Sequence, residues 1–382
     1  MTIDRSLVAG LPHDPASSFD ADSANLDFIR AAAVLLVFFS HLWDISRGEH
    51  ALAPWHLGQI GVLIFFVHTS MVLMLSLDRT RLQGLPLLLS FYVRRIFRLY
   101  PLSIFCVTVA MVSCRAPDPA APLRHWRLAE YLSNLLLTTN LTYSDNMVGG
   151  LWSLPVEAQM YLGLPCLFLL GRSRPMRVLA AFWLLSVPVA MLQLHTCARL
   201  SAVGYAPCFV AGAIAWKLST SIKRRLPGWL WPFAAASVAP VFFCARRQND
   251  MHFRWIFCLA LALLIPWFRE IGSRPLRSVA HIVARYSYGI YLSHVAVMLW
   301  SFSLPVPAWF RWAICGVLAV AVPAAMFHGI EGPMIAAGQR VAARLGVGKR
   351  NPSHAAAMEF RESARLSCGR PNASNWTGAY PP

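Results

Sequence analysis

The sequence predicts an all-α integral membrane protein, a bundle of about ten transmembrane helices with both termini in the cytoplasm. Of its 382 residues, 57% are hydrophobic and only 13% are charged, whereas an ordinary soluble domain carries about 25% charged residues. The apolar residues form blocks near the length of about 20 residues that a helix needs to cross a bilayer. This composition excludes a soluble globular protein.

Ten apolar segments are predicted to span the membrane. They are residues 26–43, 60–77, 99–113, 151–170, 178–194, 202–218, 229–244, 253–268, 286–303 and 309–327. Residues 131–141 are also apolar but too short to cross, so we interpret them as an interfacial or re-entrant segment.

The distribution of basic residues indicates the orientation of this bundle. With the N-terminus in the cytoplasm, the inner segments hold 23 Lys and Arg residues and the outer segments hold 8, as expected because basic residues are retained on the cytoplasmic side. Counting 131–141 as a span would place three of the richest basic segments outside. Topology therefore explains the net charge of +17, and no nucleic-acid partner is expected.

Three regions are predicted along the chain. Residues 1–25 form a polar cytoplasmic segment without the apolar centre of a cleavable signal, so the first span is expected to be retained. Residues 26–335 form the membrane domain, and residues 336–382 form a basic cytoplasmic tail predicted to be disordered. The nine cysteines include no C-x-x-C pair, so neither a disulfide framework nor a metal site is expected.

The first span carries two ionisable residues, Arg30 and His41, on one stripe. Eleven helical steps of about 100° return to nearly the same face, about 16 Å further along the axis. Ionisable groups inside a span are costly and typically face a cavity, which makes both candidates for function; a snorkelling arginine and a structurally bonded histidine are the alternatives. Asp44, one turn beyond His41, could orient its ring, or could simply mark the membrane boundary.

Glu157 lies about six residues into the fourth span, in the sequence LWSLPVEAQMY. Because this span enters from outside, Glu157 is expected roughly 9 Å deep, level with His41, so that both could line one cavity. A buried carboxylate needs a partner or a proton, and a purely structural ion pair is the alternative.

Other polar residues are weaker candidates. Arg94, Arg95 and Arg98 follow the second span in a predicted cytoplasmic loop, where arginines could hold a phosphorylated ligand or serve only as positive-inside anchors. The intramembrane histidines His68 and His294 could line the same cavity, although a hydrogen-bonded structural histidine is the simpler interpretation of each.

At these residues the sequence resembles membrane-bound acyltransferase family 3, bacterial enzymes that move acyl groups, commonly acetyl, onto sugars of envelope or secreted glycans. The resemblance includes an Arg, ten residues, His signature and a Trp-Ser-Leu-x-x-Glu segment, and it extends over most of the membrane domain. The matching segments are 25–41, 58–67, 91–101, 151–157, 286–294 and 328–333. The sequence departs from the family pattern at Leu63, where an Asp is common, and at Thr69-Ser70, where Ser-Gly is common.

The resemblance implies a multi-pass protein of the bacterial inner membrane that uses cytosolic acyl-CoA, commonly acetyl-CoA, as donor and no metal. It implies that Arg94, Arg95 and Arg98 hold the donor, that His41 acts as general base or transient acyl carrier, and that Glu157 polarises His41 or binds the acceptor. Trp152, His68 and His294 are candidate substrate-binding residues. The expected partners are the lipid bilayer and a glycan or lipid-linked sugar acceptor.

The sequence leaves several matters open. A secondary transporter also has many spans and intramembrane His and Glu residues, although no internal repeat is present here. A non-catalytic partner of a glycan assembly machine is the other alternative. The acceptor, the acyl group and the oligomeric state are not specified by the sequence.

Overall fold

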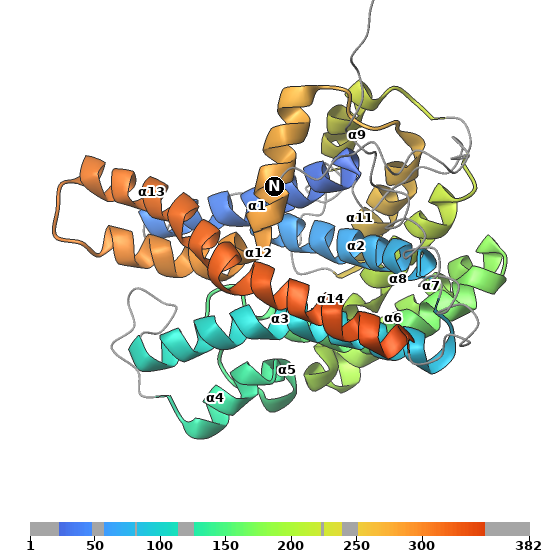
Figure 1. Cartoon of the computed structure of the whole chain (residues 1–382), viewed down its shortest axis with the longest axis horizontal. Helices are drawn as coiled ribbons and strands as arrows, with labels where there is room; N and C mark the ends of the chain where they lie inside the picture. Colours follow the sequence, from blue (N-terminus) through green and yellow to red (C-terminus); the bar gives the residue numbers. More distant parts are fainter. Residues whose placement is uncertain are drawn as a thin grey trace, which may run out of the picture.

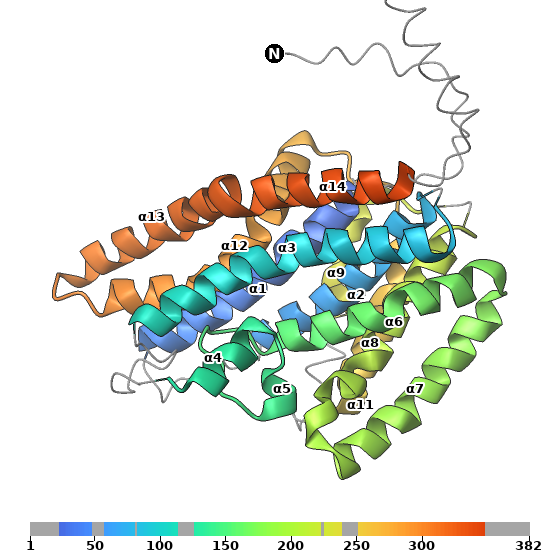
Figure 2. The ribbon, with the colours of Figure 1, turned by 60° about the horizontal axis from the view of Figure 1, so that its bottom comes forward.

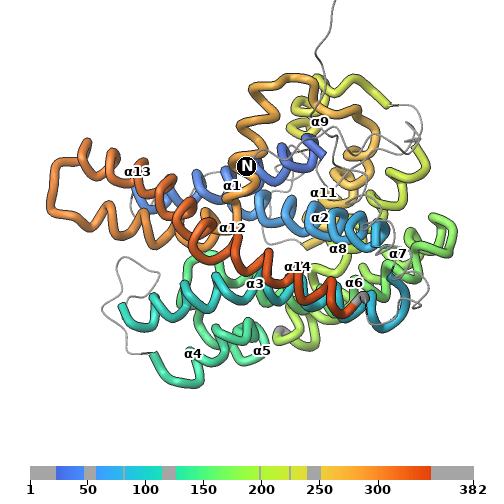
Figure 3. Tube along the Cα trace, in the orientation of Figure 1, coloured from blue at the N-terminus to red at the C-terminus, as the bar shows by residue number. Residues whose placement is uncertain are grey.

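The computed structural model describes residues 23–47, 57–80, 82–113, 126–222, 225–238 and 251–347. Within these residues the regular structure is helical, and extended backbone pairs only at one bridge between Leu226 and Phe268. Figures 1 and 3 show the helices packed side by side, with the hairpin of α12 and α13 projecting at one end.

The helices with their bounds are α1 (Ala24–Arg47), α2 (Leu57–Asp78), α3 (Gly84–Ser113), α4 (Leu128–Leu135), α5 (Thr139–Thr142), α6 (Ser153–Ser173), α7 (Met176–Thr196), α8 (Ser201–Ser219), α9 (Trp231–Ser237), α11 (Met251–Leu264), α12 (Arg274–Phe302), α13 (Ala308–Met326) and α14 (Gly332–Val347). A π-helical turn, Phe327–Glu331, joins α13 to α14.

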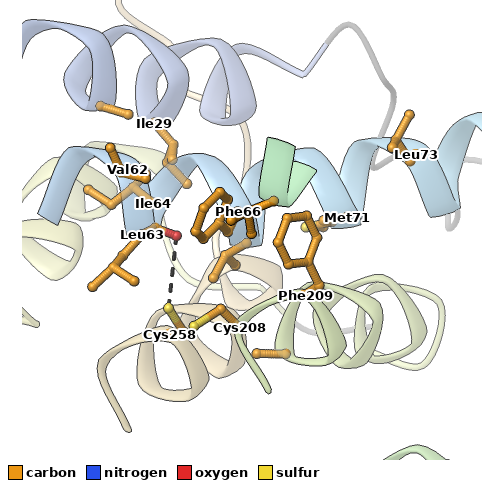
Figure 4. Packing of buried hydrophobic residues seen from close by; sticks show 14 of the residues in the cluster. Ile29, Val62, Leu63, Ile64, Phe66, Met71, Leu73, Cys208, Phe209 and Cys258 are labelled. Carbon is orange, nitrogen blue, oxygen red and sulfur yellow. Dashed lines mark hydrogen bonds between the residues drawn. The ribbon is translucent and has the colours of Figure 1, made fainter. Parts of the chain in front are cut away.

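Helix α2 forms the centre of the bundle. It is apolar on nearly all sides, as expected for a helix surrounded by others, and most of its residues are buried. Two glycines let its neighbours approach: a Cβ at Gly61 would lie 2.4 Å from the Ala33 carbonyl oxygen of α1, and a Cβ at Gly212 of α8 would lie 2.5 Å from the Val67 carbonyl oxygen. Figure 4 shows the apolar side chains of α2 packed between α1, α8 and α11.

Contacts between helices establish their relative directions (Figure 2). Asp27, Arg30 and His41 of α1 contact His281, Ser287 and His294 of α12, respectively, so these two helices run parallel. The close approach of Gly58 to Ser40 and of Gly61 to Ala33 shows that α2 runs antiparallel to α1. The residues that follow α1 therefore return through α2, and the parallel pair α1 and α12 brings together residues about 250 positions apart.

Among the described residues, seven helices are long and apolar enough to cross a membrane. They are α1, α2, α3, α6, α7, α8 and the continuous segment Ala308–Leu345. Helix α12 has 29 residues, but basic residues in its first half lower its apolarity, and Met251–Trp267 is a shorter apolar helix. The predicted span 229–244 lies partly outside the described residues. The chain is thus an all-helical, multi-span membrane protein, while the number ten and the orientation remain predictions.

Residues 131–141 form no continuous long helix. They are divided between α4, which has 8 residues, and α5, which has 4, and a left-handed Leu137 (φ 54°) lies between the two. This agrees with the interpretation of the segment as too short to cross. Figure 2 shows α4 beside α3, with α5 following α4.

Two boundaries differ from the sequence expectations. Arg94, Arg95 and Arg98 do not lie in a loop, because α3 begins at Gly84 and carries them within 30 continuous helical residues; long basic side chains can extend from a helix toward polar surroundings without interrupting it. Likewise, the expected tail boundary at residue 336 falls inside α14, which continues to Val347. Residues 1–22 and the tail beyond 347 lie outside the described part.

Candidate active site

A polar cavity of about 90 Å³ lies between α1, α2, α3, α6 and α12. Its charged lining consists of Arg30, Arg95, Arg98 and Glu157, and its apolar wall comes mainly from α2. The two sequence segments around Arg30 and Glu157, together with the arginine segment of α3, therefore meet at one place. We call this space the arginine cavity.

Arg30 reaches the arginine cavity from α1 and is held there by α12. Its Nε donates to the Ser287 hydroxyl at 2.6 Å, and Ser287 in turn donates to the Ala284 carbonyl at 2.8 Å. His68 of α2 is buried and lies within electrostatic range of Arg30. Arg30 is therefore positioned by a hydrogen bond inside the bundle, unlike an arginine that only snorkels to the surface.

Glu157 of α6 faces the same arginines. The Tyr161 hydroxyl, one turn along α6, donates to its carboxylate, and Arg30, Arg95 and Arg98 all lie within electrostatic range of it. This arrangement supplies the charge compensation that a carboxylate needs inside a membrane protein. Tyr161 was not among the candidates from the sequence, although a residue four positions after Glu157 in a helix is expected to lie beside it.

Arg98 is paired with Glu331, a second residue that sequence reasoning did not assign a role. Its Nη1 lies 2.8 Å from the Glu331 carboxylate, whose side chain is fully buried. Glu331 is carried by the π-helical turn between α13 and α14, and such turns are frequent at functional sites. The sequence did point to Glu331, because the segment His328-Gly-Ile-Glu-Gly-Pro333 is one of those that match the family pattern.

The three arginines of α3 do not share one environment. Arg95 and Arg98 line the arginine cavity, but Arg94 does not. The Nε of Arg94 donates instead to the Ser90 carbonyl one turn earlier on the same helix, at 3.1 Å. The structure therefore groups two of the three predicted donor-binding arginines with Arg30.

At the other end of α1, His41 contacts His294 of α12. The two rings have centroids 5.0 Å apart, and Nδ1 of His41 lies 3.2 Å from Nε2 of His294. Nδ1 of His41 also lies 3.0 Å from the Val37 carbonyl oxygen. Two residues that the sequence offered as separate candidates thus form one pair, which we call the histidine pair.

The acceptors around the histidine pair indicate its protonation pattern. Nδ1 of His294 faces the carbonyl oxygens of Tyr291 (2.8 Å) and Ile290 (3.1 Å), so it carries a hydrogen and leaves Nε2 as an acceptor. Nδ1 of His41 faces this acceptor and the Val37 oxygen, so it too carries the hydrogen. In the described part of the chain Nε2 of His41 has no hydrogen-bond partner, so its lone pair is available to take a proton.

Tyr291 connects the histidine pair to the arginine cavity. It lines the cavity, its ring centroid is 6.0 Å from that of His294, and its hydroxyl contacts Ser153 at 2.6 Å and the Gly150 carbonyl at 2.8 Å. Gly150 has a φ of 83°, a conformation that favours glycine, and a Cβ there would lie 3.7 Å from His294. The segment before α6 is therefore packed at the level of the histidine pair.

This packing corrects the expected position of Glu157. Because α6 begins at Ser153, beside Tyr291, Glu157 lies about one turn deeper, next to Arg30 and not level with His41. Its contacts are Tyr161 and the arginines, so the structure does not bring Glu157 to His41. The ring of His41 is contacted by Val37 and His294, and the orienting role expected for Asp44 remains a prediction.

Trp152 lies at the start of α6, outside the arginine cavity. It is about one-third exposed, and its ring centroid is 6.1 Å from that of Tyr205 in α8. The Tyr205 hydroxyl accepts a hydrogen bond from Arg254 at 2.9 Å. Trp152 is thus an accessible aromatic side chain two residues from Gly150, which packs against His294, and its role in binding substrate remains a prediction.

The two departures from the family pattern lie on different sides of α2. Leu63 is buried among apolar side chains, and its carbonyl oxygen faces the Cys258 thiol at 3.9 Å (Figure 4), whereas Thr69 lines the arginine cavity. Within the described residues there is no cluster of three or more His, Cys, Asp or Glu side chains that could hold a metal ion.

Comparison with known proteins shows the family of the chain. Segments of the chain are 30% identical over 176 residues to the protein named O-acetyltransferase OatA from three Staphylococcus aureus strains, NCTC 8325 / PS 47, COL and MRSA252. The match covers 42% of this chain and 28% of those relatives, so the chain spans less than a third of their length. No solved structure matches. A family model described as an acyltransferase domain matches residues 23–328, and the chain therefore belongs to acyltransferase family 3.

Proposed function

We propose that this protein is a membrane O-acyltransferase that moves an acyl group, acetyl in the simplest case, from cytosolic acyl-CoA to a sugar hydroxyl of an envelope or exported glycan. The observation that carries the proposal is the histidine pair, which leaves Nε2 of His41 open to accept a proton. A hydroxyl is a poor nucleophile at neutral pH, so the reaction needs a base at bonding distance. The name of the relatives, O-acetyltransferase OatA, supports acetyl as the group transferred.

The donor binds at the arginine cavity in this scheme. Arg95 and Arg98 hold its phosphate oxygens, because planar guanidinium groups match oxyanions well. Arg98 suits this role because a quarter of its side chain is exposed even though it is paired with Glu331. The extended arm of the donor then follows α1 from Arg30 toward His41, about 16 Å along the helix axis.

The transfer step requires one bond to break and one to form. Nε2 of His41 accepts the proton of the acceptor hydroxyl while the oxygen attacks the thioester carbon. The C–S bond of the donor breaks, the ester C–O bond forms, and the proton passes from His41 to the departing thiolate. His294 acts as a positioning residue, because its Nε2 accepts the Nδ1 hydrogen of His41 and so keeps the basic nitrogen in the required tautomer.

The proposed reaction also specifies an orientation in the membrane. A cytosolic donor places the start of α1 on the cytoplasmic side of a bacterial inner membrane and the histidine pair toward the outer side. The bundle of about ten spans with both termini in the cytoplasm, indicated by the basic residues, fits this placement. The acceptor then reaches His41 from the outer side.

The direct test uses membranes that contain the native chain or the variant His41→Ala, supplied with radiolabelled acetyl-CoA and a glycan extract of the host envelope. We expect label in the glycan with the native chain and a loss of about 10²–10⁴-fold in the variant, as for removal of a general base. His195→Ala is the matched control, since His195 is an exposed histidine at the end of α7.

Each other outcome has a defined meaning. Equal labelling by the native chain and His41→Ala would contradict the role of His41. Absence of labelling from both, with solute uptake by the native chain, would favour a transporter. Label retained on His41 after denaturation would indicate an acyl-histidine intermediate in place of general-base transfer.

A further inference from the structure

A second cavity, of about 650 Å³, opens between α3, α12 and α13 and is separate from the arginine cavity. Its volume falls within the roughly 300–1,000 Å³ typical of small-ligand pockets. Representative lining residues are Phe105, Val109, Ala296, Trp300, Val322 and Met326. We call this space the apolar groove.

The lining of the apolar groove has few side-chain hydrogen-bonding groups that a polar ligand could contact. Its two hydroxyl side chains, Ser113 and Ser293, donate to backbone carbonyls of their own helices, at 3.0 Å to Ala110 and 2.8 Å to Gly289. Several lining side chains are exposed, including Val109, half of whose surface is accessible. An open apolar groove on transmembrane helices is complementary to a hydrocarbon chain, which can supply the dispersion contacts that an unfilled lining lacks.

The apolar groove is next to the histidine pair. Ser293 lines the groove, and the following residue, His294, contacts His41 from the neighbouring face of α12. Met147, Val148 and Gly149 form part of the groove wall, while Gly150 packs against His294 and Tyr291. The groove and the proposed site of transfer therefore share two walls, the segment 147–150 and the turn of α12 that carries Ser293 and His294.

We propose that the apolar groove binds the hydrocarbon chain of a lipid-linked sugar, which is the acceptor of the reaction. This inference rests on the proposed function, because it assigns the acceptor class for His41. Lipid tails are as apolar as the groove itself, so burial alone gives a bilayer lipid little reason to prefer it. Selective occupancy requires a headgroup that binds nearby, and the polar site beside the groove is the histidine pair.

Tethering also supplies the sugar at high local concentration. A chain seated in the groove confines its headgroup near residues 147–150, which contact the groove at one end and His294 at the other. Linked binding of this kind raises effective concentration without new contacts to the sugar.

The test replaces Val109 with the photoreactive residue p-benzoylphenylalanine in the full chain, reconstituted into phosphatidylethanolamine and phosphatidylglycerol vesicles that carry a small fraction of polyprenyl-diphosphate-linked N-acetylglucosamine. The control places the same residue at Val317, which is exposed on α13 but does not line the groove. We expect the polyprenyl-linked sugar to be enriched about tenfold over phospholipid at position 109 relative to position 317. Lipid composition that is equal at the two positions would overturn the proposal.

A filling variant checks that the signal comes from the groove. Ala296→Trp adds a large side chain at an exposed groove position and should reduce the crosslink at 109 about tenfold, whereas Val320→Trp, on exposed surface outside the groove, should leave it unchanged. An unchanged crosslink in Ala296→Trp would overturn the groove assignment. Because crosslinking needs no donor, a positive result together with absent acyl transfer would contradict the proposed function alone.

Discussion

At the start of α1, Arg30 lies in a cavity with two further arginines and a carboxylate, whereas near its end His41 contacts another imidazole and a backbone carbonyl. The first region is charged: Arg30 donates to the Ser287 hydroxyl, Arg98 pairs with Glu331, and Glu157 lies within electrostatic range of Arg30, Arg95 and Arg98. Within the described residues the buried Nε of Arg95 has no hydrogen-bond partner. The second region uses backbone and ring hydrogen bonds. One helix thus connects two environments about 16 Å apart.

The difference shows how a membrane protein can separate two chemical tasks. Fixed charges inside a bundle are costly and require compensation, so the arginine cavity assembles Arg30, Arg95 and Arg98 with Glu157 and Glu331 and retains a formal excess of one positive charge. That excess suits an anionic ligand. The histidine pair is held by backbone carbonyl oxygens and by the contact between its two rings, and the open nitrogen of His41 suits proton transfer.

Removing charge from the arginine cavity alone tests whether the two ends of α1 act separately. The double variant Arg95→Gln, Arg98→Gln loses two charge-assisted interactions with an anionic donor, each of roughly 1.5–3 kcal/mol. We expect the KM for acyl-CoA to rise about 10²–10⁴-fold, with a much smaller change in kcat at saturating donor. Steady-state transfer measured against donor concentration provides both constants.

Arg94 is the matched control for this measurement. It lies on the same helix, but it bonds to the Ser90 carbonyl and does not line the cavity. Arg94→Gln should therefore leave the donor KM nearly unchanged. A KM that rises equally in Arg94→Gln would show that general positive charge, and not the cavity, attracts the donor.

Removing the Glu331 carboxylate, which pairs with Arg98, tests whether the stability of the protein depends on charge compensation at the arginine cavity. Glu331→Gln leaves Arg98 without its ion-pair partner, and breaking a buried pair costs roughly 3–5 kcal/mol. We expect a loss of about 2–3 kcal/mol here, because Arg98 is 25% exposed and water can solvate it partly. Unfolding in detergent by denaturant titration measures the change.

A variant of the histidine pair serves as the control for the stability loss expected in Glu331→Gln. His294→Gln keeps a hydrogen-bonding side chain at the other end of the bundle and should unfold at nearly the native denaturant concentration. If Glu331→Gln were as stable as the native chain, the ion pair would contribute no net stability, and the carboxylate would have to be assigned another role.

Removing the Tyr161 hydroxyl, which donates to Glu157, is expected to have a smaller effect on stability. Tyr161→Phe removes a hydrogen bond to a carboxylate, which is worth roughly 1.5–3 kcal/mol, but the three arginines continue to compensate Glu157. We therefore expect a stability loss of about 1.5 kcal/mol and a modest rise in donor KM. Tyr92→Phe, whose hydroxyl bonds to the Leu162 carbonyl at the bundle surface, is the control and should change the donor KM by much less.

Some of this organisation follows from the sequence because it depends on residues close together along one helix. The spacing of Arg30 and His41 places both on one stripe, and long apolar blocks identify most of the spanning helices. The sequence also grouped Arg95 and Arg98, but it placed them in a loop, whereas both lie within helix α3 because their basic side chains do not interrupt the apolar pattern around them.

The remaining geometry depends on contacts that spacing does not encode. His41 meets His294 across 253 positions only because α1 and α12 run parallel, and Arg98 meets Glu331 only because a π-helical turn places that residue opposite α3. Depth counting misplaced Glu157 because it assumed that the segment before α6 lies at the surface. That segment is packed against Tyr291 and His294, which sets α6 deeper.

The smallest expected effect is that of replacing His294. It tests whether His294 increases the rate of transfer by orienting the ring of His41. His294→Leu removes the Nε2 acceptor of the Nδ1 hydrogen on His41, leaving the Val37 carbonyl as the remaining partner. A neutral hydrogen bond contributes roughly 0.5–1.5 kcal/mol, so kcat should fall about three- to tenfold while the donor KM stays constant. His294→Gln restores an acceptor oxygen near the position of Nε2 and should recover most of the rate. A merely structural histidine would give similar losses in both variants, and loss of donor affinity in place of rate would show that the two ends of α1 are not chemically separate.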